Sequence, residues 1–195
     1  MSGIFVEPDD AATPLTPDEK KALKPTHIAT RGDLNLVEQE NILRGQDWAL
    51  ARRRDILTER FIMELHRHMF GDVWRWAGTF RTSERNIGID HWLIPTELKK
   101  LVGDVRAQTE AQSHRPGEIA VRFHHRLVQI HPFPNGNGRH ARMAADLLIM
   151  RLGGERFSWG SGSLCNPGAL RKAYIAALKA ADAHDIEPLM HFARS

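Results

Sequence analysis

The twelve residues HPFPNGNGRHAR, numbered 131–142, separate two apolar stretches and carry the most informative pattern in the chain. Two glycines alternate with two asparagines inside this segment, and both residue types tolerate positive φ angles. Consecutive backbone N–H groups in such a turn can converge on an anion, and the N-terminus of a following helix adds its positive dipole to the same place. We therefore expect a loop between two helices that can bind a phosphate group.

Three side chains of this segment suggest a chemical role for the loop. His131 stands just before it, and histidine has a pKa suited to proton transfer near neutrality. Arg139 and Arg142 are three residues apart, so a helix would place both on one face, where they can reach a polyphosphate. A base beside a phosphate site indicates that a hydroxyl attacks a phosphoryl group. A purely structural joint between helices would also use proline, asparagine and glycine, so these residues alone leave that alternative open.

Composition narrows the class of protein. With 195 residues, of which 42% are hydrophobic and 26% charged, the chain can form one globular domain with a buried core. Its apolar runs are shorter than the ~20 residues that cross a bilayer, and the first ten residues do not resemble a secretory signal. The single Cys165 fits a reducing compartment, and a net charge of +3 is small for a nucleic-acid-binding protein. We therefore expect a cytoplasmic protein, with neither a membrane nor a nucleic acid as partner.

Helical spacing of apolar residues dominates the sequence. Thr16-Pro17-Asp18-Glu19 has the residue types of a capping box, with proline at the first helical position. A short helix is expected to begin at residue 16. Longer helices are expected within residues 34–54, 58–71, 95–105, 116–130, 141–152 and 166–181, and one more short helical turn is expected after Pro188. The segment before residue 34 is rich in proline and threonine, which predicts a loosely packed N-terminal arm over 1–33 and a domain over 34–195.

Residues 79–94 depart from this helical pattern. Phe80, Ile87, Ile89 and Trp92 alternate with glycine, asparagine and aspartate, which is typical of short extended segments. The sequence therefore predicts one small β-hairpin in an otherwise all-α fold.

Residues 131–142 resemble the signature of the Fic family, His-x-Phe-x-Asp/Glu-Gly-Asn-Gly-Arg-x-x-Arg. All specified positions match except one, where Asn135 replaces the usual acid. Residues 70–78 and 174–189 resemble flanking segments of the same family, so the likeness extends over about 34–192 and is greatest to the subgroup called mobile mystery protein B. The resemblance implies an all-α, Fic-like helical bundle in which a hairpin over 81–94 is the flap that pairs with a target segment.

The resemblance also implies an activity. Members of the family move AMP from ATP to a hydroxyl side chain of a target protein, so ATP, Mg²⁺ and a protein with a reactive Ser, Thr or Tyr are the implied substrate, cofactor and partner. Carried over residue by residue, His131 would be the general base and Asn135 the residue that holds Mg²⁺ on the α- and β-phosphates. The remaining roles would be an anion hole from Gly136, Asn137 and Gly138, with Arg139 at the β-phosphate and Arg142 at the γ-phosphate.

Two positions bear on the activity that the resemblance implies. A lysine stands at the position of Gly138 in the Doc-like branch, which resembles a kinase, so glycine there favours adenylyl transfer. Asn135 offers Mg²⁺ an amide oxygen without the charge that hard cations prefer, which predicts weakened metal binding and slow catalysis.

Two functions are the alternatives to protein adenylyl transfer. One is a catalytically weak, nucleotide-binding regulatory or toxin–antitoxin module, and the other is the removal of AMP from modified proteins.

Many relatives are inhibited by a glutamate in the pattern Ser/Thr-x-x-x-Glu-Gly/Asn. The nearest match is Glu40-Asn41, with Leu36 at the hydroxyl position, so Glu40 is the candidate inhibitory residue. A solvated glutamate is the competing interpretation, and an antitoxin-like partner protein would then supply the inhibition.

Overall fold

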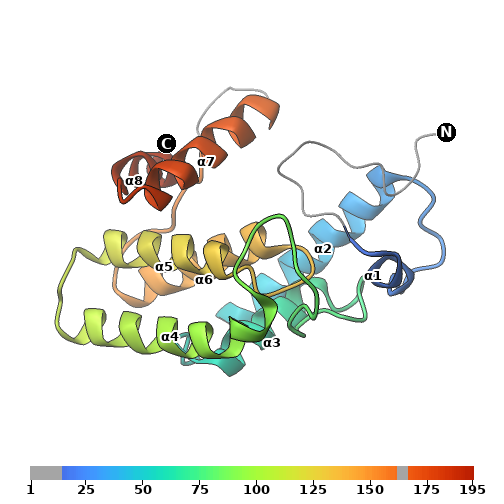
Figure 1. The fold of residues 1–195 in the computed structure, drawn as a ribbon, viewed down its shortest axis with the longest axis horizontal. Helices are drawn as coiled ribbons and strands as arrows, with labels where there is room; N and C mark the ends of the chain where they lie inside the picture. The colour runs from blue at the N-terminus through green and yellow to red at the C-terminus, as the bar shows by residue number, and fades with distance from the viewer. Residues whose placement is uncertain (1–14, 162–166) are drawn as a thin grey trace.

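The computed structural model describes residues 15–161 and 167–195, and Figure 1 shows its fold. The described residues form eight α-helices and one 3₁₀ turn, η1. Their bounds are α1 Pro17–Lys21, α2 Arg31–Leu50, α3 Glu59–Phe70, η1 His91–Leu93, α4 Ile94–Glu110, α5 Pro116–Ile130, α6 Asn137–Arg151, α7 Pro167–Asp182 and α8 Glu187–Arg194. The expected all-α fold is confirmed, and none of these helices is long and apolar enough to span a membrane.

Threonine side chains determine where the first three helices begin. Thr16 and Glu19 form the predicted capping box at α1, and Thr30 and Asp33 form a second one at α2. The Thr58 hydroxyl accepts a hydrogen bond from the amide of Phe61 at the start of α3. Each of these side chains satisfies a backbone N–H that has no partner inside its helix, which stabilises a helix by about 1 kcal/mol.

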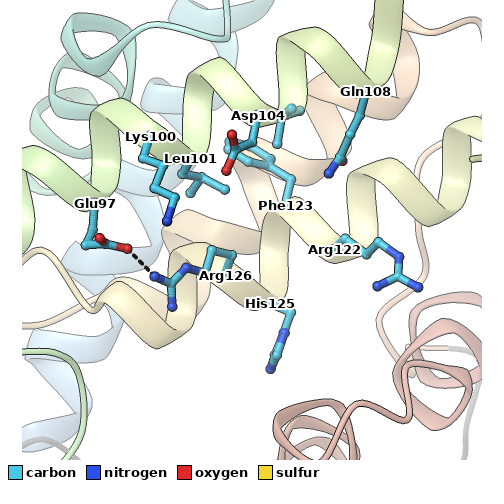
Figure 2. Close-up of a pocket in the computed structure, with 10 residues that line it drawn as sticks. Glu97, Lys100, Leu101, Asp104, Gln108, Arg122, Phe123, His125 and Arg126 are labelled. Carbon is cyan, nitrogen blue, oxygen red and sulfur yellow. Dashed lines mark hydrogen bonds and ion pairs between the residues drawn. The ribbon is translucent and has the colours of Figure 1, made fainter. Parts of the chain in front are cut away.

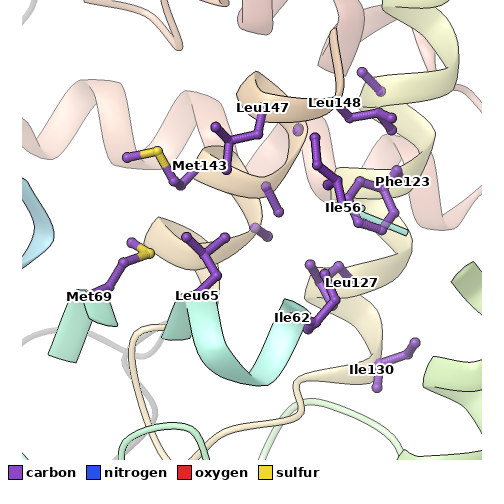
Figure 3. Packing of buried hydrophobic residues seen from close by; sticks show 14 of the residues in the cluster. Ile56, Ile62, Leu65, Met69, Phe123, Leu127, Ile130, Met143, Leu147 and Leu148 are labelled. Carbon is purple, nitrogen blue, oxygen red and sulfur yellow. The ribbon is translucent and has the colours of Figure 1, made fainter. Parts of the chain in front are cut away.

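The long helices pack around α5 and α6, which lie side by side (Figure 1). α4 packs against α5, and α3 contacts both α6 and α4. α7 and α8 form a pair that contacts α5 through α8 and through side chains of α7. Buried aliphatic and aromatic side chains from α3, α5 and α6 fill the space between these helices (Figure 3); among them are Ile62, Leu65, Phe123, Leu127 and Leu147. Because residues 131–136 join α5 to α6, the core fixes both ends of the predicted phosphate loop.

The predicted β-hairpin is wrong. Residues 79–94 contain no strand; they form an irregular loop that ends in the η1 turn. The single β-bridge among the described residues joins Leu23 to Trp74, elsewhere in the fold. Hydrogen bonds from the Arg81 side chain to the carbonyl groups of Ser83, Ile89 and His131 organise the loop instead of a ladder between strands.

Hydrogen bonds join the described part of the N-terminal arm to the segment after α3, and the division into an arm over 1–33 and a domain over 34–195 stays a prediction. The amide of Lys24 donates to the carbonyl of Val73 at 2.8 Å, and the amide of Arg75 donates to the carbonyl of Ala22 at 3.0 Å. The indole of Trp76 donates to the carbonyl of Glu19 at 3.2 Å. α1 is therefore attached to the segment that follows α3. Asn166, where the helix over 166–181 was expected to begin, and the lone Cys165 lie outside the described residues.

Candidate functional site

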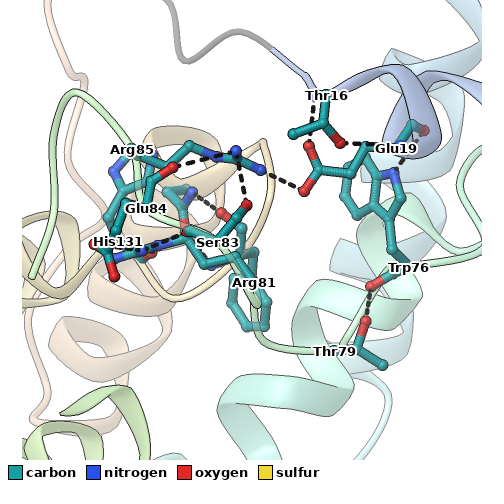
Figure 4. A network of polar contacts seen from close by, with 11 residues as sticks. Thr16, Glu19, Trp76, Thr79, Arg81, Ser83, Glu84, Arg85 and His131 are labelled. Atoms are coloured by element: carbon teal, nitrogen blue, oxygen red, sulfur yellow. Dashed lines mark hydrogen bonds and ion pairs between the residues drawn. The ribbon is translucent and has the colours of Figure 1, made fainter. Parts of the chain in front are cut away.

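His131 is the C-cap of α5, and its backbone turns the chain into the phosphate loop. Its φ of 52° and ψ of 60° lie in the left-handed region, which costs a residue with a side chain about 1 kcal/mol or more. The guanidinium of Arg81 stabilises this turn, because its Nε atom donates to the His131 carbonyl oxygen at 2.7 Å. Figure 4 shows these two residues and the loop contacts around them.

Arg81 is a functional candidate that sequence reasoning missed. Its side chain is buried, and its backbone amide also donates to the carbonyl of Pro132 at 2.9 Å. Arg81 therefore ties the loop over residues 79–94 to the first residues of the phosphate loop. A charged residue in a short polar segment gives no sign of such long-range contacts in the sequence.

The environment of His131 keeps its imidazole neutral. The side chain is 6% exposed, and burial, followed by the positive charge of Arg81, lowers the pKa of His131 to about 4. Gly88 of the loop lies against it: a Cβ at Gly88 would be 2.7 Å from the Cβ of His131. A neutral imidazole can accept a proton at physiological pH, as a general base must.

The side chain of Asn137 closes the phosphate loop. Its Oδ1 atom accepts from the amide of Phe133 at 2.9 Å, and its Nδ2 atom donates to the Phe133 carbonyl at 2.8 Å. The buried amide therefore pairs with both backbone groups of one residue. The Asn137 backbone amide is the first of α6, so its N–H group points out of the N-terminus of the helix, along the helix axis.

The N-terminus of α6 is open to an anion. Gly136 is its N-cap with a φ of 79°, and a Cβ there would be 2.7 Å from the Phe70 ring, so only glycine fits. The helix has no side-chain cap, and in residues 15–161 and 167–195 the amides of Asn137, Gly138 and Arg139 donate to no acceptor. A Cβ at Gly138 would come no nearer than 3.7 Å to another group, the hydroxyl of Tyr174.

Asn135 does not form a ready cation site. Its Oδ1 atom accepts from the amide of Gly136 at 2.6 Å and lies 3.5 Å from a guanidinium nitrogen of Arg139. Both contacts use lone pairs of this oxygen, and the positive charge of Arg139 is close by, so the oxygen is poorly placed to bind a metal ion. Among the described residues no group of three or more His, Cys, Asp or Glu side chains could hold a metal.

A buried histidine of α3 orients the Asn135 backbone. The amide of Gly78 donates to Nδ1 of His66 at 3.0 Å, so the ring hydrogen is on Nε2, which donates to the Asn135 carbonyl at 3.0 Å. The His66 ring stacks on Phe133 with centroids 3.8 Å apart. Burial holds the pKa of His66 well below its ordinary value, so the imidazole stays neutral and keeps both hydrogen bonds.

The two arginines of the loop have different partners. Arg139 forms an ion pair with buried Glu38 of α2 at 2.7 Å, and Glu38 also accepts from the indole of Trp74 at 2.7 Å. The guanidinium of Arg142 lies over the Tyr174 ring of α7, 5.4 Å from its centroid. Glu40, the predicted inhibitory residue, is exposed on the other side of α2. The carboxylate beside the site is thus Glu38.

The structure brings most of the predicted site together. His131 and Asn135–Arg142 surround the start of α6, and Glu38, His66, Arg81 and Tyr174 join them from four other segments. A separate cavity of about 390 Å³ lies between α4 and α5 (Figure 2). Its lining contains the ion pair of Arg126 and Glu97 and no residue of 131–142.

Comparison with known proteins finds a family that is similar to part of this chain. The model of the Fic/DOC family matches residues 56–149, from the end of the loop before α3 to within α6. The match covers 94 of the 195 residues, slightly less than half of the chain, and is a similarity of this segment to the Fic/DOC family. The matched segment contains the loop over 79–94, His131 and both arginines of the phosphate loop.

The similarity to individual relatives extends beyond residues 56–149. The chain is 28% identical over 185 residues to "Protein adenylyltransferase Fic" of Aedes aegypti, covering 89% of this chain and 35% of that protein. The solved structure of Fic-1 (residues 134–508) from C. elegans has a TM-score of 0.68 at 25% identity, covering 89% of this chain and 51% of that one. BepC of Bartonella tribocorum, solved with bound AMPPNP, shares the fold with a TM-score of 0.67 at 18% identity, covering 91% and 96%. The chain spans about a third of the length of the curated relative it matches.

The ion pair of Glu38 with Arg139 predicts that Glu38→Gln binds inorganic tripolyphosphate about tenfold more tightly than the wild type. Glutamine keeps the shape and an acceptor for Trp74 but removes the charge that competes with a phosphate for the guanidinium. Isothermal titration calorimetry measures the change. Glu40→Gln is the matched control, two residues away on the exposed face, and should leave the affinity unchanged. Tighter binding by Glu40→Gln instead would contradict this assignment.

Proposed function

We propose that this chain is a protein adenylyltransferase that moves the AMP part of ATP to a Ser, Thr or Tyr hydroxyl of a target protein. The observation that carries this proposal is the juxtaposition of a neutral, buried His131 with the uncapped N-terminus of α6. The adenylyltransferase name of the curated relative supports the choice of reaction, and the AMPPNP in the BepC structure supports a nucleotide at this fold.

Each group of the site has a separate role in the proposed reaction. His131 accepts the proton of the target hydroxyl, whose oxygen attacks the α-phosphorus of ATP. The bond from the α-phosphorus to the bridging oxygen breaks, and pyrophosphate leaves. The open amides of α6 and the side chains of Arg139 and Arg142 stabilise the negative charge on the phosphates. Mg²⁺ would screen the phosphates when bound with the nucleotide.

The proposed partner is a protein segment that reaches His131 past the loop over residues 79–94. Ile87 and Trp92 of this loop are exposed, and exposed apolar side chains beside a site are suited to contact a partner. The mobile mystery protein B subgroup, the cytoplasmic location and a separate inhibitory partner stay predictions from the sequence.

ATP labelled at the α-phosphate or at the γ-phosphate tests the reaction. The chain is incubated with each nucleotide, Mg²⁺ and cell lysate. The proteins are then separated, and the label that each protein carries is measured. Transfer of the α label without the γ label is the expected result. Transfer of the γ label alone would show that the reaction is phosphorylation and would contradict adenylyl transfer.

A second candidate function is a nucleotide-binding regulatory module with little catalysis. Two observations favour it: Asn135 lacks the charge that Mg²⁺ prefers, and Glu38 occupies Arg139. Tight ATP binding without transfer of either label is the result that distinguishes this module from the enzyme.

Asn135→Asp is expected to raise the rate of α-label transfer several-fold at limiting Mg²⁺. Aspartate keeps an acceptor for the Gly136 amide and adds the negative charge that a hard cation prefers. The rate is measured against Mg²⁺ concentration for both proteins, with Asn135→Ala as the variant that removes the oxygen. A large loss of transfer in Asn135→Asp would show that the neutral amide is required.

A further inference from the structure

Tyr174 of α7 is the one tyrosine of the sequence, and it lies at the edge of the phosphate loop. Its hydroxyl is the group that a Cβ at Gly138 would meet, at 3.7 Å, and its ring faces the guanidinium of Arg142. The hydroxyl is also 2.9 Å from Nε2 of His124, a fully buried residue of α5. Helices α5, α6 and α7 therefore meet at this hydroxyl.

The hydrogen bond between His124 and Tyr174 has a preferred direction. The Nδ1 atom of His124 is buried and has no hydrogen-bond partner in the described part of the chain. A buried N–H without an acceptor is costly, so the ring hydrogen is better placed on Nε2, leaving Nδ1 as a bare lone pair. Nε2 then donates to the Tyr174 oxygen.

This direction leaves the tyrosine hydrogen available. Because the hydroxyl oxygen already accepts from His124, its own hydrogen can point to a different acceptor. Burial raises the pKa of Tyr174 to about 12, so the hydroxyl keeps its hydrogen at physiological pH. Burial, followed by the charge of Arg142, holds the pKa of His124 well below its ordinary value, so the imidazole stays neutral.

We propose that the Tyr174 hydroxyl is a further phosphate ligand, which donates a hydrogen bond to the polyphosphate bound by Arg142 and the first turn of α6. The inference rests on the proposed function, which supplies the polyphosphate. It explains why a small residue stands at 138: a larger side chain would occupy the space between the hydroxyl and the start of α6. It also gives the α7–α8 pair a role in nucleotide binding.

The single tyrosine permits a direct test by fluorine NMR. Incorporation of 3-fluorotyrosine gives one ¹⁹F signal, which comes from position 174. The signal is expected to shift on addition of ATP, ADP or inorganic tripolyphosphate, and to stay in place with adenosine. A signal that is unmoved by saturating ATP would overturn the inference.

Tyr174→Phe provides the second measurement. Phenylalanine keeps the ring under Arg142 and removes only the hydroxyl, so the Kd for ATP should rise about tenfold while the Kd for adenosine stays the same. In turnover, KM for ATP should rise and kcat should change little. Equal ATP affinity in the variant and the wild type would contradict the inference and leave the proposed function standing. Failure of the wild type to bind ATP would instead refute the proposed function, and this inference with it.

Discussion

His131→Ala is expected to lower transfer of the α label at least about a hundredfold while leaving the Kd for ATP within about twofold of the wild type. Removing a general base costs a factor of 10² to 10⁴ in rate. Nucleotide binding should persist because the groups that bind phosphate, the amides of α6 and the loop closed by Asn137 and Phe133, do not involve the imidazole. Label transfer and calorimetry on the same preparation separate the two effects.

Two outcomes would contradict this assignment. Full transfer by His131→Ala would show that another group removes the proton, and loss of ATP binding would show that the imidazole supports the loop. His125→Ala is a matched control, because His125 lies on the same helix and pairs with Asp182, away from the phosphate loop. It should leave both transfer and binding unchanged.

The pH dependence of transfer follows from the same environment. Because the pKa of His131 is lowered to about 4, its imidazole is already neutral at pH 7, and the rate should be flat from pH 8 down to about 6. Below that the rate should fall as the base becomes protonated. Displacement of Gly88 by a target would reduce the burial and move the apparent pKa toward 6.5, so the midpoint should lie between these values.

Local signals in the sequence predicted most of the fold. The hydroxyl caps at Thr16 and Thr58 act over three residues, and the helical spacing of apolar residues acts over one or two turns, so both are visible in a single segment. The phosphate loop was predictable for the same reason, since its glycines, asparagines and arginines are consecutive. Its resemblance to a family signature added the reaction.

Contacts between distant segments were not predictable in this way. The loop over 79–94 was expected to pair with itself, whereas the Arg81 guanidinium fixes it to carbonyl groups fifty residues away in sequence. Glu40 stays a prediction from its sequence pattern, whereas the carboxylate that pairs with Arg139 is that of Glu38. Residues two apart on a helix point about 200° away from each other, and the pattern alone did not show which face of α2 meets α6. The position of Tyr174 beside the phosphate loop depends on how α7 packs, which the sequence pattern did not show.

The second large effect concerns stability in acid. We expect the free energy of unfolding to fall steeply between pH 7 and pH 5, by several kcal/mol in total. Four histidines are buried with pKa values lowered chiefly by burial, namely His66, His124, His131 and His140. A histidine in the unfolded chain takes up a proton near pH 6.5, whereas in the folded protein His131 and His140 do so only near pH 4.

The sign follows from proton counting. Between pH 6.5 and 4 the unfolded state binds more protons than the folded state, so stability is fully present above pH 6.5 and is lost as pH falls. From pH 7 to pH 5, His131 and His140 should each remove about 2 kcal/mol. Unfolding in urea, followed by circular dichroism at several pH values, measures the total.

A variant at one of these positions shows whether the histidines cause the loss. Nε2 of His140 is 3.0 Å from the carbonyl of Ile62, a bond that the amide of glutamine can replace without a titratable group. His140→Gln should therefore be less stable than the wild type at pH 7 but lose about 2 kcal/mol less between pH 7 and pH 5. His184→Gln, at an exposed position after α7, should follow the wild-type curve. If His140→Gln loses as much stability in acid as the wild type, the loss arises from other groups, since a neutral amide takes up no proton in this range.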